Sequence, residues 1–278
     1  MKYIFDSVSN ECSKLTTRTY STSFSLGIYF LNKKLHQPIY AIYGFVRLAD
    51  EIVDSFHDFD KMTLLSRLRK ETVQAIDEGI SLNPILNSFQ CAVHQYSIDW
   101  ELIDTFLKSM EMDLNTRDYD DNSFSEYILG SAEVVGLMCL RVFTNNDDAL
   151  YQQLKPAAMK LGSAFQKVNF LRDLKADFEG LGRSYFPGVD LNNFDAIQKR
   201  RIEKSVLKDF DDALEGIRIL PKSSRQGVYL AYIYYKALYR KITAVSAEKI
   251  MKQRIRIPNG LKFGLMINSV IRNKLNSL

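Results

Sequence analysis

Cysteine, histidine, glycine and proline are all scarce in this chain of 278 residues. The three cysteines and three histidines are widely spaced, so they form neither a disulfide framework nor the ligand set of a zinc site. Only 13 glycines and 6 prolines are present, and no low-complexity linker divides the chain. This composition predicts one domain over residues 1–278 in a reducing compartment, with the cytoplasm as the expected location.

Long apolar runs and a strong excess of one charge are also absent. No run reaches the roughly 18 apolar residues of a membrane-spanning helix, and the opening MKYIFDSVSNECSK lacks the apolar centre of a signal peptide. Lysine and arginine total 37 against 33 aspartates and glutamates, so we expect no nucleic-acid partner. Residues 246–278 alone are strongly basic, with seven basic side chains and one acidic. That segment is compatible with anionic lipid, phosphorylated ligands or solvent.

Apolar residues recur at three- and four-residue spacing over most of the chain, whereas the alternating runs typical of strands are nearly absent. The pattern predicts an all-α protein. The expected helices cover 39–56, 62–80, 100–114, 127–143, 150–178, 197–219, 226–251 and 261–275. Between them lie the chain breakers NNDD (145–148), EGLGRSYFPG (179–188), LPKSS (220–224) and IPNG (257–260).

The segment YGFVRLADEIVDSF (43–56) places two carboxylates in an otherwise apolar helix. At about 100° per residue, Asp50 falls within the apolar face and Asp54 lies at its edge, beside Arg47. An unpaired buried carboxylate is unfavourable, so it needs a basic partner or a metal ion. Arg47 is the partner in the first case, and the residues alone leave both alternatives open.

A second acidic segment, FQKVNFLRDLKADFE, has a different setting. Its polar stripe lies beside a separate apolar face and consists of Gln166, Asn169, Asp173 and Asp177. Such a stripe most often faces solvent. Alternatively, the two aspartate pairs face each other across a cavity and bind Mg²⁺, or Mn²⁺ in its place, together with phosphate oxygens. Neighbouring arginines would then hold the remaining negative charge of a diphosphate.

A series of motifs resembles, in order, those of the phytoene/squalene synthase family, the head-to-head prenyl synthases. The motifs are YSTSFSLGIYFL (20–31), AIYGFVRLADEIVD (41–54), MEMDL (110–114), YILGSAEVVGLM (127–138), NFLRDLKAD (169–177), GRSYFP (182–187) and RIRIP (254–258). The resemblance covers nearly the whole chain. It implies a class I isoprenoid synthase fold, a single helical bundle around a deep central cavity.

The resemblance also implies roles for individual side chains. The positions that match the family's Mg²⁺ ligands are Asp50, Asp54, Asn169, Asp173 and Asp177. Positions that match contacts to diphosphate, or that shape the site, are Ser21, Arg47, Gln166, Arg172, Arg254 and Arg256. Aromatic positions that match the surroundings of the prenyl chains are Phe24, Tyr43 and Tyr235, and Tyr185 falls near the cavity mouth. We expect Tyr43 and Arg47 to be catalytic together with the four aspartates.

Two positions depart from the family's pattern in the helix expected to line the prenyl channel. Leu129 stands where relatives commonly carry an aromatic residue, and Glu133 stands where they carry glycine. Chain-length selectivity is therefore not predicted from this helix.

The family reaction joins two identical allylic diphosphates through a cyclopropylcarbinyl diphosphate. GRSYFP and RIRIP are most similar to bacterial members, so we expect two geranylgeranyl diphosphates to give phytoene through prephytoene diphosphate, for carotenoid biosynthesis and without NADPH. Formation of dehydrosqualene or squalene from farnesyl diphosphate is the alternative within the fold. A non-catalytic assembly or binding homologue is the alternative from another class, and the presence of all four motif aspartates disfavours it.

Because the expected substrate and product are long hydrocarbons, we expect peripheral association with the inner face of a membrane and contact with downstream carotenoid enzymes. The segment GLKFGLMINSVIRNKL is compatible with an interfacial amphipathic helix bearing Lys262, Arg272 and Lys274. It is equally compatible with a helix packed on the core. The oligomeric state is left open.

Overall fold

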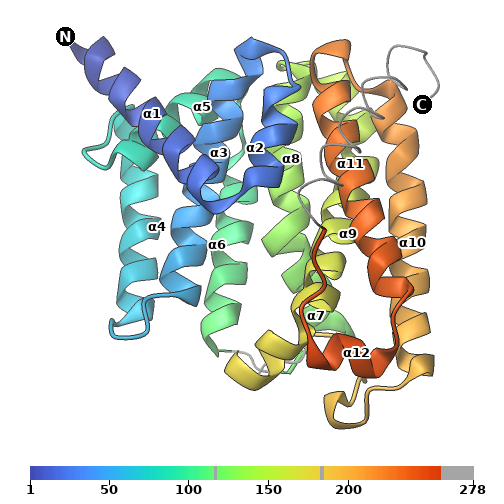
Figure 1. Cartoon of the computed structure of the whole chain (residues 1–278). Helices are drawn as coiled ribbons and strands as arrows, with labels where there is room; N and C mark the ends of the chain where they lie inside the picture. The colour runs from blue at the N-terminus through green and yellow to red at the C-terminus, as the bar shows by residue number, and fades with distance from the viewer. Residues whose placement is uncertain (116–117, 182–184, 258–278) are drawn as a thin grey trace.

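The computed structural model of the protein describes residues 1–115, 118–181 and 185–257, apart from the side chains of residues 176–181 and 192. Within these ranges the regular structure is helical and no strand is present, so the all-α prediction is confirmed. The elements are α1 (Lys2–Tyr20), α2 (Thr22–Tyr29), α3 (Lys33–Asp54), α4 (Lys61–Glu78), α5 (Pro84–Tyr96), α6 (Trp100–Asn115), α7 (Asp121–Ile128), the π-helix η1 (Leu129–Glu133), α8 (Val134–Thr144), α9 (Asp148–Leu181), the 3₁₀ helix η2 (Leu191–Asn193), α10 (Ala196–Ile219), α11 (Lys222–Thr243) and α12 (Ala247–Lys252). Most of the long helices stand side by side as a bundle (Figure 1).

Most of the helices expected from periodicity are present. The expected helices at 39–56, 62–80, 100–114, 150–178 and 197–219 correspond to α3, α4, α6, α9 and α10, and 127–143 falls within α7, η1 and α8. The expected helix at 226–251 is divided into α11 and α12, because Ser246 caps a new helix with its side chain. Helices α1, α2 and α5 are additional, and the expected helix at 261–275 lies outside the described residues.

Local signals explain where the two aspartate-bearing helices begin. Asn32 caps α3, because its side-chain oxygen accepts a hydrogen bond from the backbone N–H two residues later at 3.1 Å. Asn145 and Asn146 have left-handed φ values of 50° and 64°, which end α8. Asp147 then accepts a hydrogen bond from the backbone N–H of Leu150 at 3.0 Å. The NNDD breaker therefore ends one helix and begins α9.

Two groups of buried hydrophobic side chains form the core of the described residues. The first group contains side chains from helices α2 through α6 and from one side of α8. The second group contains side chains from the opposite side of α8 and from α7, α9, α10 and α11. Close approach of α2 and α11 depends on Gly227, where a Cβ atom would lie 2.6 Å from the carbonyl oxygen of Gly27. Helices α3 and α9 therefore belong to different groups, which places the two acidic segments on separate walls.

One stretch, Asp121–Thr144, is long and apolar enough by length and composition to cross a membrane. It comprises α7, η1 and α8. Because 56% of its most apolar window is buried and several of its side chains line an internal cavity, we interpret it as a core helix.

Candidate active site

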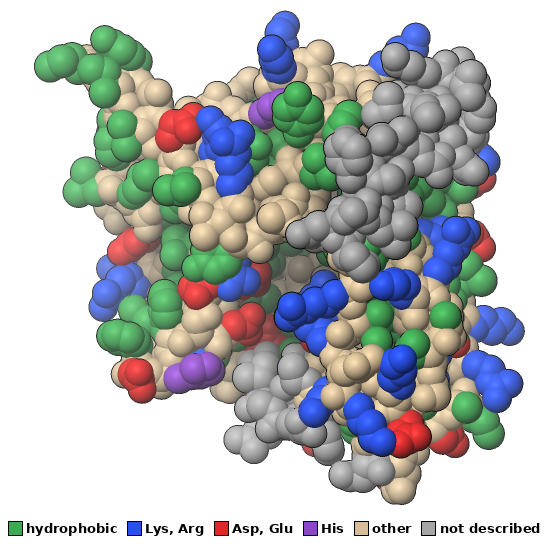
Figure 2. All heavy atoms as spheres, viewed as in Figure 1, with side chains coloured by type: hydrophobic (Ala, Val, Ile, Leu, Met, Phe, Trp, Pro, Cys, Tyr) green, Lys and Arg blue, Asp and Glu red, His purple; other side chains and the backbone are tan. Residues whose placement is uncertain are grey.

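A cavity of about 620 Å³ lies between the two groups of core side chains. One end of it, near the C-terminal ends of α3 and α9, is charged and is lined by Arg47, Asp50, Asp54, Asp113, Arg172, Asp173 and Arg254. The other end is apolar and is lined by Leu31, Phe143, Leu154, Ile217 and Leu220. Figure 2 shows red and blue side chains around a hollow near the centre of the view. A long apolar space with one charged end suits a ligand that has a hydrocarbon chain and an anionic head.

Helix α3 forms the first acidic wall. Tyr43, Val46, Arg47, Asp50 and Asp54 all line the cavity, as the helical spacing predicts. Asp50 is partly buried, whereas Asp54 is exposed at the mouth. The apolar face of this helix thus carries its carboxylates toward the cavity.

Arg47 does not pair with Asp50. Its guanidinium donates a hydrogen bond to Glu51, and it lies over the ring of Tyr20 at 4.3 Å from the ring centre. Its buried Nε has no hydrogen-bond partner among the described residues. Arg47 therefore forms no direct ion pair with Asp50, although its charge lowers the pKa of that carboxyl. A buried donor of Arg47 remains available to an anion in the cavity.

The carboxyl group of Asp50 has an unusually high pKa. Burial raises the pKa of its carboxyl to about 7, the nearby Asp54 and Asp113 carboxylates add to the rise, and Arg47 opposes it. A carboxyl with such a pKa lacks sufficient positive charge around it in the protein alone. A bound cation would supply that charge.

Helix α9 forms the second wall, and part of its polar stripe faces inward. Gln166, Asn169 and Asp173 line the cavity, so for these three the solvent-exposed alternative is wrong. Arg172 donates two hydrogen bonds to Asp173, at 2.5 and 3.0 Å. Arg254 contacts the same carboxylate at 2.7 Å. The side chain of Asp177 lies outside the described residues, although its backbone belongs to α9.

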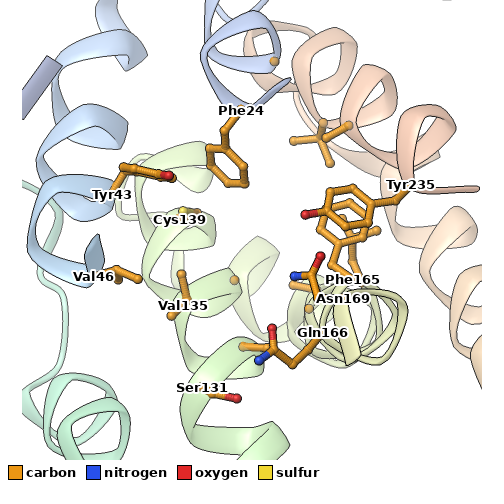
Figure 3. Close-up of a pocket in the computed structure, with 18 of the residues that line it drawn as sticks. Phe24, Tyr43, Val46, Ser131, Val135, Cys139, Phe165, Gln166, Asn169 and Tyr235 are labelled. Atoms are coloured by element: carbon orange, nitrogen blue, oxygen red, sulfur yellow. The ribbon is translucent and has the colours of Figure 1, made fainter. Parts of the chain in front are cut away.

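Aromatic side chains line the cavity on both sides. Phe24 and Tyr43 have ring centres 5.3 Å apart, and Phe165 and Tyr235 stack at 3.9 Å on the other side. Figure 3 shows these two pairs facing the open space from opposite sides. Ser21 caps α2 and also lines the cavity. The middle of the cavity is thus bounded by aromatic faces, which stabilise positive charge.

Asp113 was not predicted as a site residue, although the MEMDL motif contains it. It is buried and accepts hydrogen bonds from the hydroxyl groups of Tyr127 at 2.7 Å and Tyr185 at 3.3 Å. Burial, and then the Asp113 carboxylate, raise the pKa of Tyr127 well above its usual value, so this phenol keeps its proton. All three side chains line the cavity. Tyr185, expected near the mouth, therefore reaches the site together with two partners that the sequence reading did not assign.

Three positions singled out in the sequence lie away from the cavity. Leu129 packs against the core group around α3, and neither it nor Glu133 belongs to the cavity wall. Burial raises the pKa of Glu133, and Lys160 of α9 opposes the rise. Arg256 is exposed and does not line the cavity, unlike Arg254. The residues of α7, η1 and α8 that line the cavity are Tyr127, Ser131, Ala132, Val135, Gly136, Cys139, Leu140 and Phe143.

The donor set fits a hard divalent cation shared with a phosphate ligand. Oxygen donors stand on both walls, and the buried Oδ1 of Asn169 has no hydrogen-bond partner among the described residues. Within the described side chains, no three acidic, histidine or cysteine groups are close enough to hold an ion by themselves. Mg²⁺ is commonly held by one or two carboxylates together with substrate phosphates. The two walls meet that requirement without a complete protein cage.

The chain matches a family model and curated proteins over most of its length. The model of squalene/phytoene synthase matches residues 17–260. Phytoene synthase of Rhodobacter capsulatus is 28% identical over 283 residues, covering 94% of this chain and 80% of that protein. The 4,4'-diapophytoene synthase of Staphylococcus haemolyticus is 24% identical over 274 residues, covering 90% and 92%.

Solved structures agree in fold. A dehydrosqualene synthase in complex with a ligand has a TM-score of 0.83 and 19% identity, with 99% of both chains covered. A squalene synthase from Alicyclobacillus acidocaldarius has a TM-score of 0.72 and 22% identity, with 85% of this chain and 93% of that chain covered. The class I isoprenoid synthase fold is therefore confirmed. With the family model matched over most of its length, this chain belongs to the squalene/phytoene synthase family, a family of prenyltransferases.

Proposed function

We propose that the protein condenses two geranylgeranyl diphosphates head to head, through prephytoene diphosphate, to phytoene with release of diphosphate. Membership of the family supports the reaction type, and similarity to phytoene synthases supports the product. The choice of a C20 substrate rests on the curated relatives, among which phytoene synthases are the more numerous, and the depth of the cavity is compatible with it.

The length of helix α9 that lines the cavity gives an estimate of the cavity's depth. It lines the cavity from Asp173 at the charged end to Leu154 at the apolar end, a span of about 28 Å at ~1.5 Å per residue. An extended C20 prenyl chain spans roughly 19 Å and a C15 chain roughly 14 Å, at about 1.25 Å of advance per carbon–carbon bond. The cavity is therefore long enough for a C20 chain together with its diphosphate, and it also accommodates a C15 chain.

The side chains divide the work between the two ends of the substrate. Arg47, whose Nε lacks a partner among the described residues, and Arg172 bind the diphosphate from opposite walls. Tyr43 and Tyr235, each beside a second aromatic ring, face the allylic carbons, where positive charge develops as the diphosphate leaves. The apolar end excludes water, which would otherwise quench the cation.

We also propose Mg²⁺ as the cofactor, held by Asp50 and Asp54 on α3 and by Asn169, Asp173 and Asp177 on α9. When bound, it neutralises the charge that develops on the departing diphosphate. We expect turnover to disappear after exhaustive chelation and to return with added Mg²⁺ or Mn²⁺. The measurement is diphosphate release under both conditions. Undiminished turnover in the chelated protein would contradict the assignment of a metal to these walls.

The product distinguishes this proposal from its alternatives. Purified protein with Mg²⁺ is incubated with geranylgeranyl or farnesyl diphosphate, with and without NADPH, and the hydrocarbon is identified by mass spectrometry. We expect phytoene from geranylgeranyl diphosphate, formed equally well without NADPH. Squalene that appears only when NADPH is added would overturn the assignment.

A second candidate function has specific support. The 4,4'-diapophytoene synthase matches 90% of this chain and 92% of its own length, and a dehydrosqualene synthase shares the fold closely. A C30 product from farnesyl diphosphate, with no reductant, would favour that function. The comparison of kcat/KM for the two substrates decides between them, and we expect the C20 substrate to be preferred.

A further inference from the structure

Helix α1 buries a polar face. Ser9, Ser13 and Thr17 succeed one another by one turn and are fully buried. The hydroxyls of Ser9 and Thr17 donate to backbone carbonyls four residues earlier, at 2.8 and 2.9 Å, and Asn87 of α5 donates to Ser9 Oγ at 3.1 Å. A Cβ atom on Gly44 of α3 would lie 3.0 Å from Ser13 Oγ. The neighbouring helices thus admit only small side chains, and α1 is fixed about its own axis.

The opposite face of α1 is apolar and exposed. Ile4, Val8 and Leu15 are 47%, 52% and 67% exposed and fall within about 40° of one another around the helix, opposite Ser13. We call these three residues the α1 stripe. Six of the sixteen exposed large hydrophobic residues in the described chain belong to residues 1–20, and Figure 2 shows hydrophobic side chains along this helix. Single exposed apolar residues are ordinary, and what sets α1 apart is the concentration of such residues on one helix.

We propose that the α1 stripe docks the protein on a lipid bilayer. The choice of occupant rests on the proposed function, because C20 substrates and their C40 product dissolve in lipid. Continuity with the site supports it. Tyr20 at the end of α1 lies over Arg47, and Ser21, the next residue, lines the cavity. A bilayer-bound α1 therefore holds the charged end of the cavity near the lipid from which substrate comes.

A second copy of the chain fits the stripe less well. From Ile4 to Leu15 the helix advances about 17 Å, which with a helix width of about 10 Å gives a face of roughly 170 Å². A stable dimer buries about 800 Å² per partner. A bilayer requires no complementary partner surface, and apolar side chains on one helix face suffice for interfacial binding.

Charge plays a minor part in this docking. Residues 1–20 carry three basic and two acidic side chains, and Lys14 pairs with Glu11 at 2.7 Å. Binding through the α1 stripe therefore depends on insertion of apolar side chains more than on anionic lipid. This distinguishes it from docking through the basic segment that follows residue 246, which would require anionic lipid.

The test compares two triple variants of the full chain by flotation with vesicles of phosphatidylcholine, with and without phosphatidylglycerol. The first is Ile4→Ser with Val8→Ser and Leu15→Ser. The matched control makes the same chemical change on α10, at Ile197, Leu207 and Ile219, which are 74%, 39% and 47% exposed. We expect the α1 variant to bind vesicles at least about tenfold more weakly, the control to bind as the wild type does, and both to keep their turnover in detergent.

A second measurement does not depend on the triple variant. Trp100 is the only tryptophan, so Leu15→Trp in a Trp100→Phe background reports on one place alone. Its emission should shift to shorter wavelength when vesicles are added. The proposal is overturned by unchanged flotation of the α1 variant, by an unshifted emission, or by sedimentation that shows the stripe joining two copies. Vesicle binding is measured without substrate, so an error in the proposed reaction leaves this result readable.

Discussion

Replacing Asp50 or Asp173 by asparagine is expected to lower turnover by at least about 10²–10³-fold while the bundle stays folded. Asparagine keeps the shape of aspartate but removes the negative charge that attracts a divalent cation. The loss of one group that stabilises charge in the transition state typically costs that much, and the two residues stand on opposite walls of the cavity. The measurement is kcat at saturating geranylgeranyl diphosphate and Mg²⁺.

Asp104→Asn is the matched control. Asp104 is also ion-paired, with Arg69 and Lys108, but it does not line the cavity. We expect its turnover to stay near the wild-type value, which would show that the loss of an ion pair alone is not enough. Near-normal turnover in the Asp50 or Asp173 variant would assign that aspartate a structural role only.

The sequence predicted the two acidic walls because the signal there is local. On a helix, side chains one turn apart share a face, so the placement of Asp50 among apolar residues already indicated its direction. The stripe on α9 was ambiguous by itself, since the face of Asn169 and Asp173 is polar and a polar face usually meets solvent. Only the surrounding helices decide that it meets a cavity, and the family resemblance stood in for that information.

The periodicity of apolar residues does not predict contacts between distant segments of the chain. Asp113, Tyr127 and Tyr185 come from α6, α7 and the segment after α9, and their hydrogen bonds join residues 14 and 72 positions apart. The motifs around all three residues were recognised, but nothing local shows that two phenols share one carboxylate. The pairing of Arg47 with Glu51 differs, because an i,i+4 spacing on a helix is visible in sequence.

Helix α1 was not predicted from the sequence, because its buried face is polar and its exposed face is apolar. Periodicity locates a helix by the apolar residues that it buries, whereas α1 buries Ser9, Ser13 and Thr17. The hydroxyls of Ser9 and Thr17 find partners within the helix itself or on α5, whereas the buried Ser13 hydroxyl has none among the described residues. All three side chains are small, so this polar face packs tightly against α3 and α5. The expected core face is therefore absent, and the apolar residues that do recur point outward.

The Asp50 carboxyl should destabilise the metal-free protein increasingly as pH rises from about 4 to above 7, and Asp50→Asn should remove that contribution. The carboxyl has a pKa of 3.8 as its ordinary value and about 7 in the folded state. The folded state therefore binds the Asp50 proton more firmly than the unfolded chain does. Below about pH 4 both states hold the proton and the residue costs nothing, whereas above pH 7 the folded state carries a desolvated charge.

At about 1.4 kcal/mol for each pKa unit between the two states, and with solvent in the cavity reducing the effect, we expect Asp50→Asn to stabilise the metal-free protein by about 2–4 kcal/mol at pH 8. The difference should vanish at pH 4. Urea unfolding in a chelating buffer at both pH values measures it. Added Mg²⁺ should stabilise the wild type at pH 8 more than the variant, because binding to the folded state alone shifts the equilibrium. Equal stabilities at pH 8 would mean that Asp50 is already compensated by the protein, and the argument that its carboxylate awaits a cation would fall.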